Sequence, residues 1–69
     1  MKINFKLDNV TKGAVRYQEI NDQGQALEGD DGHVCTMYFR KAKLGSISPT
    51  WASTGEPPKF LTVIVEERS

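Results

Sequence analysis

The stretch Val34–Gly45, VCTMYFRKAKLG, holds two adjacent aromatic residues and three basic ones. Aromatic rings that stack on bases and cations that pair with phosphates are the two ingredients that single-strand nucleic-acid binders combine. Successive side chains of a strand face opposite ways, so Tyr38 shares a face with Arg40 whereas Phe39 points into the core. We therefore interpret the stretch as a core strand whose outer face ends in a basic turn. Nucleic-acid binding through Tyr38, Arg40 and Lys43 is the alternative.

A wider candidate binding surface includes residues outside this stretch. Arg16 and Tyr17 lie in the strand expected beside it, and Trp51 lies in the loop that follows it. A buried Trp51 would plug one open end of a sheet, whereas an exposed Trp51 would anchor a partner, because Trp, Tyr and Arg dominate binding hot spots. We favour the buried position for Trp51, because the chain has few other large apolar side chains to fill its core. The candidate surface comprises Arg16, Tyr17, Tyr38, Arg40, Lys41, Lys43 and Trp51.

His33 and Cys35 are two residues apart near the start of a strand, so they would point to the same face. They are the sole His and Cys of the sequence, and two ligands do not complete a zinc site. A Cys–His nucleophile would also need an orienting group and an oxyanion hole. The acidic residues 28–32, EGDDG, lack the spacing of an EF-hand loop. We predict a small buried thiol, a solvated acidic loop, and no catalytic, cofactor-binding or metal-binding residues.

Four segments show the patterning of strands. Residues 2–8, KINFKLD, alternate apolar and polar side chains, which predicts a half-buried strand. Residues 13–20, GAVRYQEI, lose this alternation near Gln18–Glu19, where a bulge or the strand end is expected. Turn residues between these two segments predict an antiparallel hairpin. Residues 34–40 give the third strand. Residues 59–67, KFLTVIVEE, are apolar on both faces, which predicts a central strand or one covered on both faces, and we favour the central position.

Two long connections join the later strands. Residues 21–33 hold three glycines and four acids, so we expect a solvated and mobile loop. Residues 44–58 contain Ser48 followed by Pro49, which read as an N-cap and the first helical position. One short helical turn is therefore predicted over residues 48–53.

Length and composition narrow the class of protein. With 69 residues, the chain is expected to form one small domain over 1–69. A core of this size gives only a small free energy of unfolding by itself. A single cysteine cannot form an internal disulfide, so association with a second copy is the expected support, and a well-packed monomer is the alternative. Nine basic and nine acidic residues cancel, which argues against a general nucleic-acid coating protein. The alternating start and the lack of a long apolar stretch predict a cytoplasmic protein that does not enter membranes.

The order of three motifs resembles a recurring type of short all-β bacterial protein of unassigned function. The motifs are TKGAVRYQE (11–19), TMYFRKAKLG (36–45) and PPKFLTVIVE (57–66). The resemblance covers most of the chain, and SISPTWAST looks like an addition before the last strand. It implies a fold type and no activity.

We therefore predict a small all-β domain, with a four-stranded, mostly antiparallel sheet or partly open barrel and one short helical turn. Exposed sheet edges invite pairing, so a homodimer formed by strand addition or by packing of apolar faces is expected. The predicted function is a non-enzymatic interaction module, without a cofactor, that acts through self-association or a protein partner. A single-stranded nucleic acid is the alternative partner.

Overall fold

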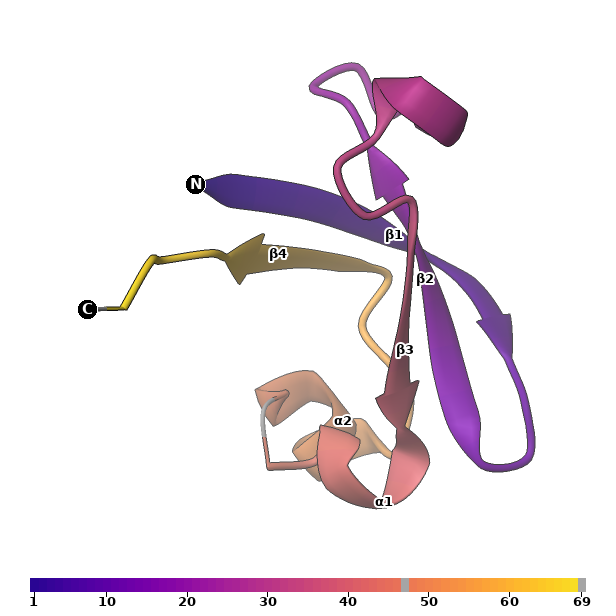
Figure 1. Cartoon of the computed structure of the whole chain (residues 1–69). Coiled ribbons are helices and arrows are strands. Elements are labelled where there is room, and N and C mark those ends of the chain that lie inside the picture. Colours follow the sequence, from indigo (N-terminus) through magenta and orange to yellow (C-terminus); the bar gives the residue numbers. More distant parts are fainter. Residues whose placement is uncertain (47, 69) are drawn as a thin grey trace.

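The computed structural model of the chain describes residues 1–46 and 48–68, and there it contains four strands and two short helices (Figure 1). The strands are β1 (Lys2–Val10), β2 (Ala14–Ile20), β3 (Thr36–Arg40) and β4 (Phe60–Ile64). The helices are α1 (Lys41–Leu44) and α2 (Pro49–Thr54), and a 3₁₀ turn, η1, covers Gly29–Asp31. Within the described ranges, no helix is both long enough and apolar enough to cross a membrane.

The strands form one antiparallel sheet in the order β3–β2–β1–β4. β1 and β2 make the predicted hairpin, which Thr11 closes by donating its N–H to the carbonyl oxygen of Ala14 at 2.8 Å. A register shift between Leu7 and Asn9 interrupts β1, and such irregularities bend a strand and increase its twist. The sheet therefore curls into a half-open barrel with β3 and β4 at its two edges (Figure 1). The predicted fold class is confirmed.

A small core lies on the inner face of the curled sheet. Alternate residues of β1 and β2 point inward, as the period of two requires. The buried apolar residues are Ile3, Phe5, Val15, Tyr17 and Leu44. The rings of Tyr17 and Phe39 meet edge to face, with centroids 5.6 Å apart and an interplanar angle of 89°. The Tyr17 hydroxyl donates to the carbonyl oxygen of Pro58 at 2.7 Å, which ties β2 to the chain entering β4.

The α1–α2 segment connects the end of β3 to the start of β4 and covers the open end of the sheet (Figure 1). Ser48 caps α2, since its Oγ accepts the N–H of Trp51 at 3.2 Å and Pro49 follows it. Gly55, with φ of 74°, ends the helix in the left-handed conformation. These contacts confirm the predicted short helical turn. α1 stands where a basic turn was predicted, and its last residue, Leu44, is fully buried.

β4 is an edge strand, so the predicted central position is wrong. Its inward residues Leu61 and Val63 are half-buried, whereas Phe60 and Ile64 are 67% and 61% exposed. Apolar residues on both faces of a strand usually indicate cover on both faces. Here the outer face of β4 remains open to solvent.

β2 has no bulge at Gln18–Glu19, but its pairing with β3 stops at Gln18 and the strand ends at Ile20, so the strand end expected near these residues is confirmed. The apparent break in the apolar pattern is a buried carboxylate, because Glu19 faces inward with the core residues of β2 and is only 1% exposed. The irregularity of the hairpin lies instead in β1, between Leu7 and Asn9.

Replacing Leu44 by alanine should lower the free energy of unfolding by about 2–4 kcal/mol, because the change leaves a cavity between α1 and the sheet. Urea denaturation followed by circular dichroism measures this loss. The control Val10→Ala trims an apolar side chain that is 43% exposed, and it should cost less than about 0.5 kcal/mol. Equal losses in the two variants would contradict the placement of Leu44 in the core.

Candidate functional site

The predicted basic and aromatic surface is assembled only in part. Tyr38 is 61% exposed on the outer face and lies opposite Arg16 of β2. The Nε atom of Arg16 donates to Oδ2 of Asp8 at 2.7 Å. Interaction with Tyr38 and with Asp8 raises the pKa of the Arg16 guanidinium above its ordinary value. One of the predicted cations is therefore already engaged with an acid.

Tyr17 does not belong to this surface, which corrects its assignment from the sequence. Its side chain has no exposed area, and neighbours on a strand cannot share a face, so Tyr17 points inward where Arg16 points outward. Burial raises the pKa of the Tyr17 hydroxyl. Because that hydroxyl donates to Pro58, it serves the fold and is not presented to a ligand.

The remaining predicted cations do not form one continuous strip. Arg40 and Lys43 are exposed, whereas Lys41 is half-buried and donates its backbone N–H to the carbonyl oxygen of Gly13 at 3.1 Å. Lys41 and Lys43 are two residues apart in α1, which is about 200° around the helix axis. Their side chains therefore diverge.

Trp51 is half-buried and packs from α2 against the core. A Cβ atom added to Gly45 would lie 3.2 Å from Cδ1 of Trp51, so the indole rests closely on the chain that follows α1. This position favours the plug at the open end of the sheet over an exposed anchor for a partner.

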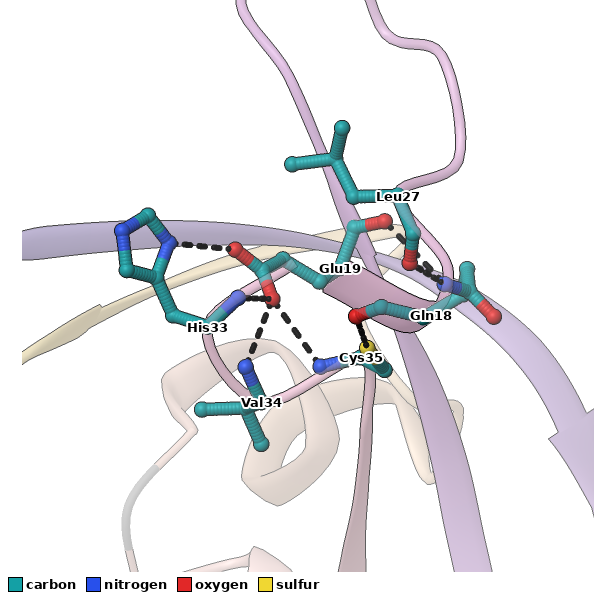
Figure 2. Close-up of polar contacts among 7 residues, drawn as sticks. Gln18, Glu19, Leu27, His33, Val34 and Cys35 are labelled. Atoms are coloured by element: carbon teal, nitrogen blue, oxygen red, sulfur yellow. Dashed lines mark hydrogen bonds and ion pairs between the residues drawn. The ribbon is translucent and has the colours of Figure 1, made fainter. Parts of the chain in front are cut away.

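A polar cluster centred on Glu19 was not selected from the sequence (Figure 2). One carboxylate oxygen, Oε1, accepts the backbone N–H groups of His33, Val34 and Cys35 at 2.7, 2.8 and 2.9 Å. The other oxygen, Oε2, lies 3.0 Å from Nδ1 of His33. The Glu19 side chain is 2% exposed, so these protein groups replace the water that it has lost.

The protonation state of Glu19 follows from two opposing effects. Burial favours the neutral acid and by itself raises the pKa. Hydrogen bonds from Val34, Cys35 and His33 outweigh burial and lower the pKa of Glu19 to about 2, from an ordinary 4.5. A general acid or base works best with a pKa near the operating pH. The cluster is therefore suited to anchoring a loop and poorly suited to proton transfer.

The backbone around this carboxylate is shaped to fit it. Cys35 has a φ of 68°, which is uncommon for a residue other than glycine. A backbone that enters the left-handed region lets successive N–H groups converge on one anion. A Cβ atom on Gly32 would lie 2.8 Å from Sγ of Cys35 and 2.9 Å from Oε1 of Glu19, so the loop needs glycine there. Regular pairing of β3 therefore starts only at Thr36.

The backbone of Glu19 also holds the acidic loop. Its N–H donates to the carbonyl oxygen of Cys35 at 2.7 Å, and its carbonyl oxygen accepts the N–H of Leu27 at 2.9 Å. Nε2 of Gln18 donates to the carbonyl oxygen of Leu27 at 2.8 Å (Figure 2). The connection over residues 21–33 is exposed, as predicted. Hydrogen bonds at Leu27, within it, and at Cys35, just after it, hold it to the end of β2.

His33 and Cys35, the pair considered from the sequence, have separate surroundings. His33 contacts Glu19, whereas Sγ of Cys35 lies 3.5 Å from the carbonyl oxygen of Gly29. Cys35 is half-buried, not fully buried as predicted. Across residues 1–46 and 48–68, no group of three or more His, Cys, Asp or Glu side chains is placed to hold a metal ion.

The free edge of β4 is a second candidate site. Phe60, Ile64 and Val65 are exposed apolar residues, and the run Phe60–Val65, FLTVIV, carries no charge. Uncharged runs of this length with high β-propensity readily pair with other strands. Reasoning from the sequence missed this site because it placed the strand in the middle of the sheet.

A hollow of about 400 Å³ lies beside β4. Its lining includes Asn4, Ile20, Asn21, Gln23, Phe60 and Thr62. The Thr62 hydroxyl donates to Oδ1 of Asn4 at 2.8 Å, and Oδ1 of Asn21 accepts the backbone N–H of Gln23 at 2.9 Å.

Comparisons with protein-family models, curated proteins and solved structures find no match to this chain. The resemblance to short all-β bacterial proteins therefore stays a prediction.

The stabilisation from Glu19 should depend on pH. The folded pKa lies below the unfolded one, so the contribution is complete above about pH 5 and is lost as the pH falls towards 2. Glu19→Gln should flatten this dependence and lower the free energy of unfolding at neutral pH by roughly 1–3 kcal/mol, because charge-assisted hydrogen bonds are lost. Urea unfolding at a series of pH values measures both effects.

The control for this experiment is Glu56→Gln, which makes the same chemical change at an exposed position. This variant should unfold like the parent protein at neutral pH. If Glu19→Gln kept the stability and the pH dependence of the parent, the carboxylate would not be the anchor of the loop.

Proposed function

We propose that the protein is a non-enzymatic interaction module that binds an extended protein strand at the free edge of β4. The observation that carries this proposal is the exposure of Phe60 and Ile64, at 67% and 61%, on an edge strand without charged residues. In strand addition, backbone hydrogen bonds supply affinity and alternate side chains supply specificity. A cytoplasmic setting fits the free thiol of Cys35.

The backbone of β4 supports this mode of binding. Val65 and Met1 exchange two hydrogen bonds, of 2.7 and 2.9 Å, at one end of the β1–β4 ladder. Successive residues of an antiparallel strand direct their N–H and C=O groups to opposite sides. The backbone groups of Phe60, Thr62 and Ile64 therefore face the free edge. Among the described residues, these three make no backbone hydrogen bond outside the sheet.

The two edges of the sheet differ in their protection. β3 ends in Arg40, and Lys41 and Lys43 follow it directly. Charged residues at an edge discourage unwanted strand pairing. β4 itself has no charged residue between Phe60 and Val65, and its nearest charges, Lys59 and Glu66, flank the strand. This contrast favours β4 as the edge that receives a partner.

Strand addition can be tested with a fluorescent peptide that copies residues 59–66, KFLTVIVE. The peptide should bind the protein in an anisotropy titration. Ile64→Lys should weaken binding by roughly tenfold or more, because a charged side chain would replace the apolar one that contacts the added strand. The substitution changes a side chain that is 61% exposed, so the fold should tolerate it.

Tyr38→Lys is the matched control, because Tyr38 is also 61% exposed but lies on the other edge of the sheet. This variant should bind the peptide as the parent protein does. The proposal fails if the parent protein, diluted until it is monomeric, does not bind the peptide, or if Ile64→Lys and Tyr38→Lys bind it equally well.

Single-stranded nucleic-acid binding is the second candidate function. It is supported by the exposed ring of Tyr38 together with exposed Arg40 on the same face of β3. Lys43 adds a further exposed cation. The ion pair of Arg16 with Asp8 and the zero net charge argue for weaker phosphate binding than a dedicated nucleic-acid protein has.

Anisotropy with a labelled oligothymidine distinguishes the two functions. Nucleic-acid binding should be micromolar or tighter at low salt and should weaken steeply as salt increases. The double variant Arg40→Glu/Lys43→Glu should abolish it without affecting peptide binding at β4. An absence of oligonucleotide binding at low salt would eliminate this second function.

A further inference from the structure

We infer that the strand received at β4 is β4 of a second copy of this chain, paired antiparallel about a two-fold axis at Thr62. The inference rests on the proposed function, since it names the partner of the same edge. Three properties of the edge support it: the pattern of its free backbone groups, the side chains on its outer face, and the charges at its ends.

The free backbone groups are self-complementary. Phe60, Thr62 and Ile64 direct their N–H and C=O groups to the open side of β4. With Thr62 on the axis, Phe60 of one copy lies opposite Ile64 of the other, and Thr62 lies opposite its own symmetry mate. Every free backbone group of the strand then has a partner. A shift of register by two residues would leave some of them unpaired.

The outer side chains match in the same register. Each pairing of Phe60 with Ile64 sets an aromatic ring against a β-branched side chain, which is a favourable cross-strand pair, and the symmetry repeats it. Both side chains are more than 60% exposed in the single chain, so the contact would remove much apolar area from water. Thr62 between them is small enough to lie beside its own copy.

The charges at the two ends of β4 fix the direction. Lys59 precedes the strand, and the acids Glu66 and Glu67 follow it; all three are exposed. Antiparallel pairing brings Lys59 close to the acidic end of the second copy, and this happens at both ends of the interface. Parallel pairing would instead align like charges, which is unfavourable across strands.

The assembly closes after two copies. A two-fold interface uses the same edge of both subunits, so no β4 edge remains for a third. The outer edges of the joined sheet are then the two β3 strands, whose ends carry Arg40 and Lys41. These charges oppose further growth of the sheet.

Disulfide trapping tests both the partner and the register. The parent for these variants is Cys35→Ser, which removes the native thiol and retains the backbone N–H that Glu19 accepts; its melting temperature is first checked against that of the unmodified protein. In the inferred register, the two copies of residue 62 have Cα atoms about 5.5 Å apart, within the range of a disulfide. The two copies of residue 60 are roughly 14 Å apart, too far to bridge.

Three results are expected under mild oxidation. Thr62→Cys should form a covalent dimer, Phe60→Cys alone should not, and a mixture of Phe60→Cys with Ile64→Cys should form the mixed disulfide. Light scattering over a dilution series of the parent protein should show twice the monomer mass at high concentration. This combination supports the inference.

The remaining outcomes overturn it. A dimer whose cysteines link in another pattern, or a monomer at every concentration that still binds the 59–66 peptide, excludes the inferred dimer and leaves the proposed function standing. A monomer that also fails to bind the peptide overturns the inference and the proposed function together.

Discussion

The carboxylate of Glu19, buried at the end of β2, is the contact on which the arrangement of the chain depends. It collects three backbone N–H groups from residues 33–35, while its own backbone bonds Leu27 and Cys35. A buried charge that loses its partners costs several kcal/mol, so the loop cannot leave without exposing or protonating the acid. The anchor therefore sets where β3 begins and how it pairs with β2.

The two unequal edges of the sheet follow from this start. Because β3 begins at Thr36, Tyr38 faces outward opposite Arg16, and Phe39 meets Tyr17 in the core. The chain then turns into α1 and α2, which close the open end of the sheet and bring the chain back to β1 as β4. One edge consequently ends in a basic helical turn, while the other has no charged residue within its strand and remains open. A small domain buries a limited share of its surface when it folds alone. Pairing at the open edge would bury more apolar surface and so stabilise the fold.

The sequence predicts the strands and helices well, but it predicts the order of the strands in the sheet and the long-range contacts less well. Alternation in β1, the hairpin and the Ser48–Pro49 cap are local signals, and the structure confirms them. The inward position of Glu19 was misread as a slip, because a carboxylate on the core face is recognisable only once its partners fourteen to sixteen residues away are known. The glycine-rich loop before His33 was the available signal. The edge position of β4 could not be predicted either, because an exposed apolar edge strand has the same composition as a buried central one.

Hydrogen exchange of the Thr62 amide, followed as a function of protein concentration, reports whether β4 pairs with a second copy. This amide faces the free edge of β4, so in the single chain it bonds to water, whereas strand pairing would protect it. Exchange at Thr62 should slow as concentration rises, while the amide of Cys35, bonded to Glu19 within the chain, should keep a constant rate. Exchange at Thr62 that is equally fast at all concentrations would contradict the pairing of β4 with a second copy.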